Sequence, residues 1–407
     1  MAFLTNNMRI DDSDQFWISL DSADAYDTTT VLSNEIKING TGVYSSFAGR
    51  YFGNSVAVAP NRKLVIGSNK GDASTQRGAV HIFDSDGSNE TVILAPANLR
   101  GVSFPYFGTS VSASNDRIVV GTFSDSDATE AGSAYIINYD GSIINNMKSP
   151  DAQANGRFGR DVAIGDGRVL VGAFKEDTYG RVYVYDENGS NLFELTGDND
   201  DPNGDFYGEN VEVANGRIVV GAPQVAQSGK IHIYDLNGNE IKKIESPVGS
   251  DAKFGRAIDI GNGKIIVGAP YDDGAGNDRG SAYIYDLNGN LLKTLTAPDT
   301  ADHDRFGSVV GVGDGRIVIG ADGNDDIALN SGSLYIYDIN GNYLEKVTPT
   351  TVSAGDDFGN SNLSLSVRNG KVLISSWQAD SYYSDEGAAY VYDIPRQRHL
   401  LDLLNDF

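Results

Sequence analysis

The stretch FGRDVAIGDGRVLVGAF, residues 158–174, contains the pattern that decides the fold of this chain. Val162 and Ile164 before the Gly-Asp-Gly at 165–167, and Val169 and Val171 after it, recur at every second position. Such alternation is typical of half-buried strands, and Gly-Asp-Gly suits the positive φ angles of tight hairpin turns. The next stretch, GRVYVYDENGSNLFELTG at 180–197, repeats this design around Asn188-Gly189. Together the two stretches predict four short strands joined as an antiparallel meander.

The same unit recurs along the whole chain. Each copy opens with an aromatic residue followed by Gly, at Phe52, Phe107, Phe158, Tyr207, Phe254, Phe306 and Phe358. A period of roughly 50 residues is within the range of propellers and solenoids. Seven four-stranded sheets arranged radially make an all-β, seven-bladed propeller, which is the fold that we predict. A solenoid of stacked sheets is the alternative, and the hairpin turns in every unit disfavour it.

A fragment of a repeat stands ahead of the first complete unit. SNEIKING, residues 33–40, is similar to the fourth strand in GNEIKKIE, residues 238–245, and the seventh unit has Pro395 where its last hairpin turn is expected. We therefore predict that the N-terminal strand completes the last blade and closes the ring, which removes a free sheet edge. In the alternative, RHLLDLL at 398–404 is that fourth strand and residues 33–40 are loose.

This closure divides the chain into three predicted parts. They are an N-terminal arm at 1–32, the propeller at 33–394 and a C-terminal tail at 395–407. The arm contains an apolar cluster with Phe16 and Trp17, and the tail contains Leu400 and Leu404. We expect these four residues either to pack on the ring or to join the chain to a larger assembly.

The two ends of the meander differ in sequence. The turns between strands one and two are short in every unit, whereas the loops after strands two and four vary, as at 270–280, 296–305 and 322–332. Variable loops on a rigid scaffold usually contain the binding residues, so we predict binding at the variable end. The candidate ligand or partner residues there are Tyr271, Asp272, Asp273, Asp322 and Asp325.

FGRAIDIGNGKIIVGAPYDDGAGNDRGSAYIYD at 254–286 and GRIVVGAP at 216–223 resemble FG-GAP repeats. These repeats form the seven-bladed propellers of integrin α subunits and of some lectins and bacterial surface proteins. The resemblance covers residues 33–393 and implies the fold, while propellers serve many unrelated functions. Many family members have a long Asp-rich calcium loop between strands one and two. Here that turn is as short as GDGR or ANGR, with too few oxygen ligands, so the resemblance implies no calcium site in it.

Composition restricts the partners. The chain has 407 residues, a formal net charge of −25 and no cysteine. Its negative charge disfavours nucleic acid and anionic membrane surfaces, and without cysteine it has no disulfide or thiolate site. We expect no membrane insertion, because the sequence lacks a run of about 20 apolar residues. The first residues do not resemble an export signal, so we expect synthesis in a cytoplasm.

No catalytic motif is visible in the sequence, so we predict no enzyme activity and no cofactor. His81 and His232 occupy equivalent strand positions where other units have Tyr, which favours a structural role. Asn199, Asp201 and Asn203 have the spacing of a calcium loop. However, Asn210 stands where a bidentate Glu is required and Pro202 interrupts the loop, so this is a weak candidate and we predict no metal site.

These features lead to two functional hypotheses. The first is a bacteriophage virion structural protein, tail-associated or on the capsid surface, that mediates assembly with other protein subunits and attachment to the host surface. It rests on the acidity, the near-identical repeats, the absence of cysteine and of an export signal, and the flanking segments. The alternative is an extracellular, lectin-like or adhesive module, because loops rich in Tyr, Asn and Asp suit glycans. A propeller enzyme ranks below both.

Overall fold

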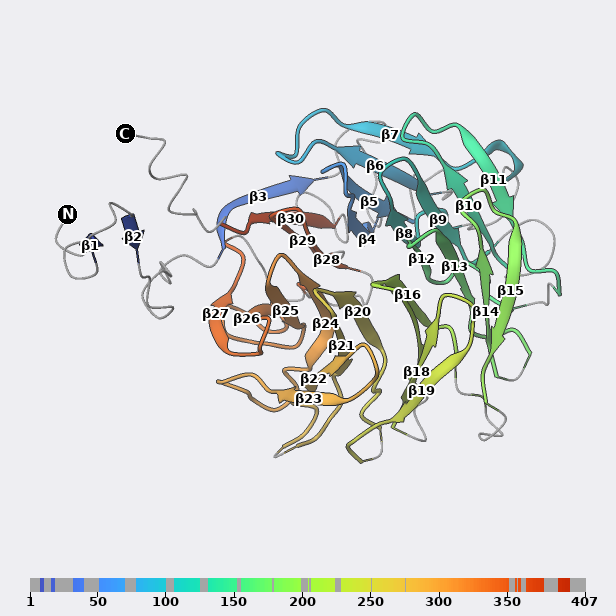
Figure 1. Cartoon of the computed structure of the whole chain (residues 1–407). Helices are drawn as coiled ribbons and strands as arrows, with labels where there is room; N and C mark the ends of the chain where they lie inside the picture. The colour runs from blue at the N-terminus through green and yellow to red at the C-terminus, as the bar shows by residue number, and fades with distance from the viewer. Residues whose placement is uncertain are drawn as a thin grey trace.

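The chain folds into seven four-stranded antiparallel sheets around a central axis, as the computed structural model shows (Figure 1). The all-β seven-bladed propeller is therefore confirmed, and the solenoid alternative is wrong. The structure describes the following residues, with the backbone alone for the first two ranges: 8–10, 16–18, 32–39, 51–69, 78–99, 106–124, 131–151, 155–177, 179–198, 204, 206–223, 228–249, 251–274, 276–350, 356, 358–359, 364–376 and 387–395.

In blades 1–6 the strands run from the axis outward in chain order, and in blade 7 the early strand β3 is outermost. Blades 1 and 2 consist of β4 (Phe52–Val58), β5 (Leu64–Ser68), β6 (Ala79–Phe83) and β7 (Thr91–Leu94), and of β8 (Ser110–Ala113), β9 (Ile118–Thr122), β10 (Ser133–Ile137) and β11 (Ile143–Met147). Blades 3 and 4 consist of β12 (Val162–Gly165), β13 (Arg168–Ala173), β14 (Arg181–Tyr185) and β15 (Asn191–Thr196), and of β16 (Asn210–Ala214), β17 (Arg217–Ala222), β18 (Lys230–Asp235) and β19 (Glu240–Glu245).

The remaining blades follow the same order. Blades 5 and 6 consist of β20 (Ala257–Gly261), β21 (Lys264–Ala269), β22 (Ser281–Asp286) and β23 (Leu291–Leu295), and of β24 (Phe306–Gly313), β25 (Arg316–Ala321), β26 (Ser333–Asp338) and β27 (Tyr343–Val347). Blade 7 consists of β28 (Leu365–Arg368), β29 (Lys371–Ser376), β30 (Ala388–Asp393) and β3 (Ser33–Asn39).

Ring closure by the N-terminal strand is confirmed. β3 pairs antiparallel with β30, with Ile36 opposite Val391 and Ile38 opposite Ala389. Glu35 strengthens this joint, because its carboxylate accepts hydrogen bonds from the Thr350 hydroxyl (2.7 Å) and the Tyr392 hydroxyl (3.1 Å). The rival fourth strand at 398–404 lies outside the described residues.

The repeated glycines let neighbouring blades approach closely. Gly159, after the buried Phe158, has φ +84°, and a Cβ added at Gly121 of blade 2 would overlap the Gly159 carbonyl oxygen. A parallel bridge also joins Gly132 of blade 2 to Phe158 of blade 3. Since a side chain at either contact would separate the backbones, the aromatic-Gly pair and the second-strand Gly are the joint between blades.

Aromatic rings fill the space between blades. Phe158 is fully buried and its ring centroid lies 5.4 Å from that of Tyr183, in β14 of the same blade. Val119 and Ala134 of blade 2 belong to the same cluster. Each aromatic-Gly pair thus closes one inter-blade core, and truncating such a ring to Ala typically costs 3–5 kcal/mol.

The two ends of the ring are built differently, and we call them the turn face and the loop face. The turn face comprises the short turns between strands one and two and between strands three and four. There, the side chain at the positive-φ position of one turn accepts a hydrogen bond from a Gly N–H of the next blade. These bonds are Asp166–Gly216 (2.7 Å), Asn215–Gly263 (2.9 Å), Asn262–Gly315 (3.1 Å) and Asp314–Gly370 (2.8 Å).

Asn369 continues this series into blade 1, because its amide donates to the Ala59 carbonyl at 2.8 Å. The turns of the turn face are therefore short and similar because they bond to one another. The loop face comprises the loops after the second and fourth strands, and its loops differ from blade to blade.

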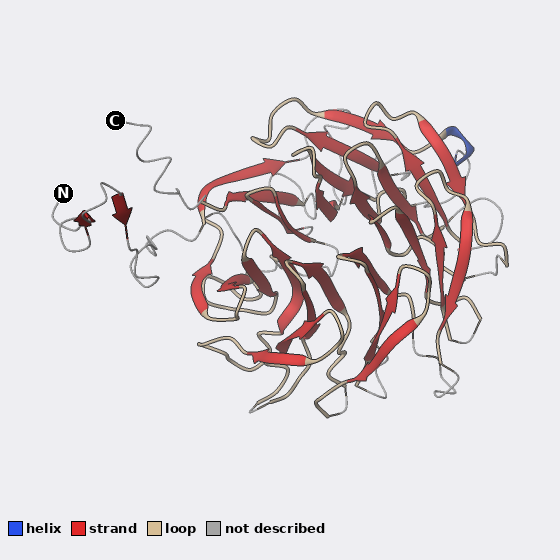
Figure 2. Ribbon diagram, viewed as in Figure 1, coloured by secondary structure: helices blue, strands red, loops and turns tan. Residues whose placement is uncertain are grey.

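Strands dominate the described chain (Figure 2). A 3-10 turn, η1 (Ala97–Leu99), follows the first blade, and β1 (Met8–Ile10) pairs with β2 (Phe16–Ile18) in a separate two-stranded sheet that the sequence did not predict. Within the described ranges, no helix is long and apolar enough to cross a bilayer.

Candidate functional site

Two of the five predicted ligand residues lie inside their loops. Asp272 is 7% exposed and accepts hydrogen bonds from the Gly274 N–H (3.0 Å) and the Tyr283 hydroxyl (3.3 Å). Asp322 is 4% exposed, and its carboxylate lies 3.6 Å from Arg305. Both side chains hold the loop face together from within. Their role in contacting a ligand stays a prediction, and a ligand could reach these two side chains only if the loops opened.

The other three predicted residues reach solvent. Asp273 and Asp325 are exposed, and each accepts a hydrogen bond from its own loop, from the Asp278 N–H (3.1 Å) and the Asn330 N–H (2.6 Å) respectively. Tyr271 is half-buried. The structure places Tyr271 and Asp273 in the loop of blade 5 and Asp325 in that of blade 6, so the surface-accessible set is divided between two blades.

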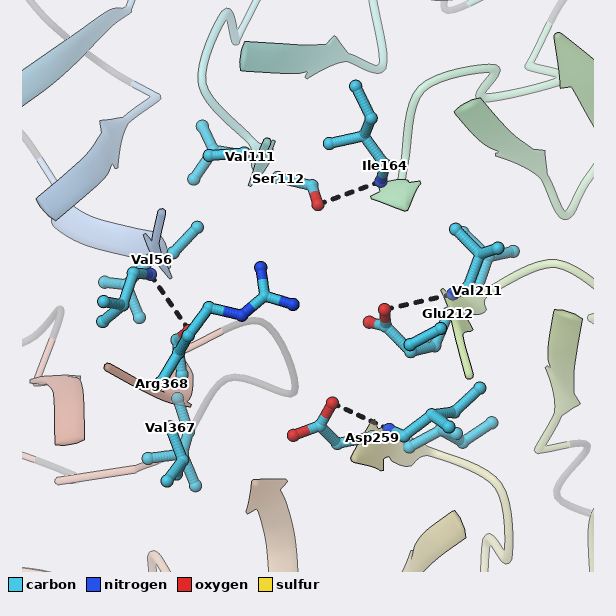
Figure 3. A pocket seen from close by; sticks show the side chains of 18 of the residues that line it. Val56, Val111, Ser112, Ile164, Val211, Glu212, Asp259, Val367 and Arg368 are labelled. Carbon is cyan, nitrogen blue, oxygen red and sulfur yellow. Dashed lines mark hydrogen bonds between the residues drawn. The ribbon is translucent and has the colours of Figure 1, made fainter. Parts of the chain in front are cut away.

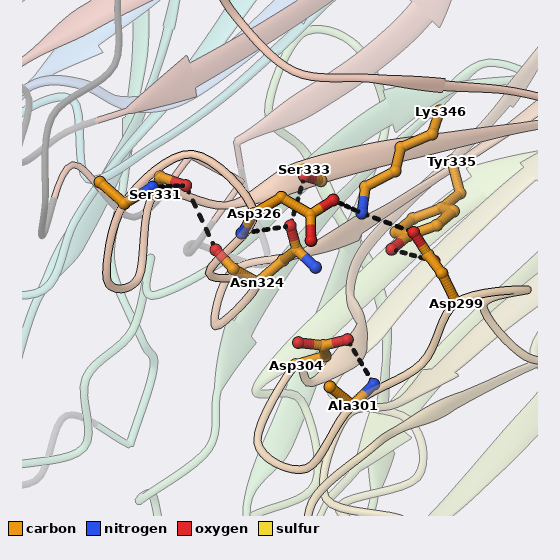
Figure 4. Close-up of polar contacts among 10 residues, drawn as sticks. Asp299, Ala301, Asp304, Asn324, Asp326, Ser331, Ser333, Tyr335 and Lys346 are labelled. Atoms are coloured by element: carbon orange, nitrogen blue, oxygen red, sulfur yellow. Dashed lines mark hydrogen bonds and ion pairs between the residues drawn. The ribbon is translucent and has the colours of Figure 1, made fainter.

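One lysine joins the loops of blades 5 and 6. Lys346 of β27 contacts the carboxylates of Asp299 (2.8 Å) and Asp326, and the Tyr335 hydroxyl donates to Asp299 at 2.7 Å (Figure 4). Burial alone would lower the pKa of Lys346, but its hydrogen bonds to the two carboxylates outweigh burial and raise it. The charged ammonium therefore ties the loop before blade 6 to the loop after its second strand.

One residue position recurs from blade to blade on the loop face, and we call this set the mouth ring. It consists of the residue before each aromatic-Gly pair, namely Tyr51, Tyr106, Arg157, Phe206, Lys253 and Arg305. All six are half-buried and have φ between +52° and +57°. The equivalent residue of blade 7, Asp357, lies outside the described residues. Positive φ is unusual for such large side chains.

The backbone of the mouth ring explains this conformation. In blade 3 the Arg160 N–H donates to the Arg157 carbonyl at 3.1 Å, and in blade 5 the Arg256 N–H donates to Lys253 at the same distance. The turn fixes the backbone and leaves the side chain free to vary. Aromatic residues occupy three of the six positions and cations the other three.

Two cations of the mouth ring, Arg157 and Lys253, lie over aromatic rings that follow second strands. The Arg157 guanidinium is 5.5 Å from the ring centroid of Phe123 and 5.8 Å from that of Phe174. Phe123 also stacks on Tyr106 at 4.5 Å, and Phe174 meets Phe206 edge-on at 5.4 Å. These contacts form a continuous row across blades 2–4 in which one cation lies between two pairs of aromatic rings.

Blade 5 repeats the arrangement around a predicted residue. The Lys253 ammonium lies 4.5 Å from the ring centroid of Tyr271, and Arg256 donates to the Tyr271 hydroxyl at 3.2 Å. Sequence reasoning found Tyr271 but missed the mouth ring. The available signal was a large residue, instead of Gly or Asn, directly before six of the seven aromatic-Gly pairs.

The central channel is a second polar site. It encloses ≈ 140 Å³ between the first strands, and Ser112, Glu212, Asp259, Ser366 and Arg368 are among its lining residues (Figure 3). Several of these side chains bond to the next blade. Asp259 accepts from the Val312 N–H at 2.6 Å, and Ser366 accepts from the Val58 N–H at 3.0 Å. The channel residues thus link the inner strands of neighbouring blades.

Carboxyl groups in the channel resist ionisation. Burial between the strands raises the pKa of Glu212 well above its usual value, and the neighbouring Asp259 adds to the rise. Burial likewise raises the pKa of Asp259, although backbone hydrogen bonds and Arg368 oppose it. Asp161, which bridges blades 2, 3 and 4, has its pKa raised to about 6 by burial. Burial between the inner strands thus favours the protonated form of these carboxyl groups.

For the predicted calcium site and the flanking apolar residues, the structure provides no side-chain geometry. Within the described ranges, no group of three or more His, Asp or Glu side chains is arranged to hold a metal ion. The calcium candidates Asn199, Asp201 and Asn203 lie outside the described residues, as do Leu400 and Leu404. For Phe16 and Trp17 the structure describes only the backbone of β2.

His81 and His232 contact glutamates of their own blades, at 2.7 Å from Glu90, just before β7, and 2.8 Å from Glu240, in β19. This placement agrees with the structural role that the sequence favoured.

The stretches that match a known repeat family contain the aromatic-Gly pairs that form the inter-blade joints. The FG-GAP repeat family matches residues 101–137, 145–185, 240–285 and 291–337. These stretches include first, second and third strands of blades 2, 3, 5 and 6, with the aromatic-Gly pair of each blade. The chain is a seven-bladed β-propeller in which four stretches match FG-GAP repeats. No curated protein sequence matches it.

Solved structures similar to this propeller include two WD40 domains. The WD40 β-propeller domain of Doa1 is 14% identical, with a TM-score of 0.53, and the match covers 90% of this chain and 97% of that one. The Pan2 WD40 domain of Neurospora crassa is 13% identical, with a TM-score of 0.51, covering 84% of this chain and 89% of that one. At such identities the likeness shows the fold alone.

Proposed function

We propose that this propeller is a non-enzymatic binding module that assembles with other proteins through its loop face. The contrast between its two faces is the observation that supports this function. Turns on the turn face bond to the next blade, as Asn215 does to Gly263. On the loop face, Asp273 and Asp325 instead bond within their own loops. Such loops can change without disturbing the ring, which suits a surface used for recognition.

The assembly that we propose is a bacteriophage virion, in which the chain is tail-associated or lies on the capsid surface and contributes to host attachment. The acidity and the near-identical repeats support a rigid, soluble disc with one variable face. Phe16, Trp17, Leu400 and Leu404, which flank the ring in sequence, are the proposed additional contacts with neighbouring subunits.

Cross-linking of purified phage particles tests this proposal. A lysine-reactive reagent can report on Lys175 and Lys253 of the loop face and on Lys264 and Lys371 of the turn face. We expect mass spectrometry to find the chain in the particles, with cross-links to other proteins mainly from the loop-face lysines. Particles that lack the chain would refute the virion role, and cross-links mainly from the turn face would refute the loop-face assignment.

The alternative function, a lectin-like or adhesive module, is favoured by Tyr271, which is half-buried beside the exposed Asp273. An aromatic ring next to a carboxylate suits sugar binding. Saturable binding of the full chain on a glycan array, lost in Tyr271→Ala and kept in Tyr343→Ala on the outer strand of blade 6, would establish this function instead.

A further inference from the structure

We propose that the loop between β25 and β26 of blade 6 docks onto a protein segment in which apolar and basic side chains alternate. The contact is made by residues 325–330, which we call the blade-6 tip, with Ile327 and Leu329 at its centre. This inference rests on the proposed protein-binding function and names the part of the loop face that is used and the chemistry of the partner.

The first observation is the exposure of two apolar side chains. Ile327 is 58% exposed and Leu329 is 67% exposed, the largest values among the exposed large apolar residues in the described part of the chain. The others are 38–50% exposed and all lie in outer strands, as Leu291 and Leu292 of β23 do. Single apolar residues at a surface are ordinary, but two at the end of one loop indicate a contact surface.

The second observation is that hydrogen bonds hold this loop in place. Asp325 accepts a hydrogen bond from the Asn330 N–H at 2.6 Å, which joins the two ends of the blade-6 tip. Below it, the buried Asn324 accepts a hydrogen bond from the Ser333 hydroxyl at 2.8 Å, which anchors the loop to β26 (Figure 4). A loop that is already fixed loses little conformational freedom when a partner binds.

The third observation is the charge around the apolar pair. Asp325 is exposed, and the side chains of Asp326 and Asp299 are 52% and 47% exposed. Lys346 contacts both Asp326 and Asp299, so these four groups carry three negative charges and one positive charge. An apolar centre with a polar rim is the usual arrangement of a protein interface, and an acidic rim favours basic groups on the partner.

The same features select among possible partners. The net charge of −25 repels a second copy of the chain and an anionic membrane. Sugars and nucleic-acid bases stack on aromatic rings, which the aliphatic Ile327 and Leu329 do not offer. A protein segment with alternating apolar and basic side chains covers the apolar pair and meets the carboxylates at the same time.

The test measures binding of the full chain to a short fluorescent peptide of alternating Leu and Lys by fluorescence anisotropy at physiological salt. We expect saturable binding, and at least tenfold weaker binding of the matched Ser and Lys peptide. Ile327→Ser with Leu329→Ser should weaken binding of the Leu and Lys peptide about tenfold or more, because the apolar contact is lost. Leu291→Ser with Leu292→Ser, which removes two exposed apolar side chains of β23, is the matched control and should bind normally.

A second variant tests the acidic rim and keeps the loop intact. Asp325→Asn removes one negative charge but keeps an oxygen that can accept from the Asn330 N–H. It should weaken peptide binding several-fold, and the difference should shrink as salt is added. Asp86→Asn is the matched control, because Asp86 is an exposed carboxylate of the turn face that likewise accepts a hydrogen bond, from the Ser88 N–H.

Because the chain has no cysteine, one introduced cysteine can carry a dye that senses its surroundings. The emission of a dye on Ala328→Cys should shift to shorter wavelength when the Leu and Lys peptide is added, whereas a dye on Thr294→Cys in β23 should not shift. A shifted emission in the free chain would show that the chain itself covers the blade-6 tip. A shift that grows with protein concentration would indicate a second copy, and a shift with phosphatidylcholine vesicles would indicate a lipid surface. Each of these three results overturns the proposal.

The proposal is also overturned if the Leu and Lys peptide does not bind, if the Ile327 and Leu329 double variant binds it as well as the β23 control does, or if Asp325→Asn and Asp86→Asn bind it equally. If loop-face cross-links form in particles while the peptide does not bind, the protein-binding function stands and only this partner chemistry is refuted.

Discussion

The turn face and the loop face are made by the same strands, yet their stability has different sources. On the turn face, Asn215 of blade 4 bonds to Gly263 of blade 5, and Asn262 of blade 5 bonds to Gly315 of blade 6. On the loop face, Asp273 and Asp325 bond to backbone groups of their own loops. The turn face is therefore linked from blade to blade through these side chains, while the exposed carboxylates of the loop face bond within single loops.

The largest effect that we expect comes from the turn face. Asn215→Ala with Asn262→Ala should lower the free energy of unfolding by about 4 kcal/mol, from two lost hydrogen bonds and two non-glycine residues forced to positive φ. Chemical denaturation measures it. The matched Gly pair should cost only about half as much, because Gly tolerates positive φ. Equal costs for the Ala and Gly pairs would contradict this explanation.

Lys346 couples two loops of the loop face, as Arg181 and Arg279 do elsewhere, because it contacts Asp299 and Asp326. Lys346→Met should destabilise the protein by about 2 kcal/mol, since two carboxylates lose their shared counter-charge. Asp299→Asn in the same chain should recover part of that loss in a double-mutant cycle. Purely additive effects would show that Lys346 does not couple the loops.

The channel that joins the two faces gives a pH-dependent prediction. Because the folded-state pKa of Glu212 is raised, its contribution to stability is present below its unfolded pKa of about 4.3 and is lost as pH rises through the folded pKa. Glu212→Gln should therefore stabilise the protein at pH 7 and have little effect at pH 4. We expect about 1 kcal/mol at pH 7, because solvent in the channel screens the charge of Glu212. Thermal unfolding across this range measures the difference. A variant that is less stable at pH 7 would contradict the prediction.

The smallest effect belongs to the exposed loop carboxylates. Asp273→Ala with Asp325→Ala should change the free energy of unfolding by less than about 1 kcal/mol, because each side chain caps only its own loop. Denaturant midpoints measured beside those of the turn-face Ala pair give the direct comparison of the faces. A loss similar to that of the turn-face pair would show that the loops also support the ring.

The sequence predicted most of the fold because its signals are local and repeated. Alternating strands, turn residues and aromatic-Gly pairs each act within one unit, and the similarity of 33–40 to 238–245 predicted the closure by β3. The inter-blade bonds of Asp166 and Asn215 were not predicted, because the partner of each is about one repeat away along the chain. The sequence of a short turn accounts for its local conformation, but it does not indicate which residue of the next blade the turn contacts.

The candidate site was predicted less well for a related reason. Asp272 and Asp322 were predicted to contact a ligand because aspartates in loops are usually exposed. Instead, contacts with Tyr283 and Arg305 keep them buried. The mouth ring was missed because positive φ is unexpected at Arg157 or Phe206. Whether a loop side chain is buried, and which residues meet across blades, depends on tertiary contacts that one unit does not contain.

Closure of the ring by β3 also delays the last folding step until synthesis of the chain is almost complete. Asn34 donates its amide to Asp393, 359 residues later, and β3 has no strand partner until β30 has been made. At a translation rate of roughly 5–20 residues per second, that delay is on the order of 20–70 s. Blades 1 to 6 each contain four consecutive strands and can form in turn during this time. Blade 7 can therefore be completed only when nearly the whole chain has been made. Until then β3 is an unpaired strand with which other chains can pair.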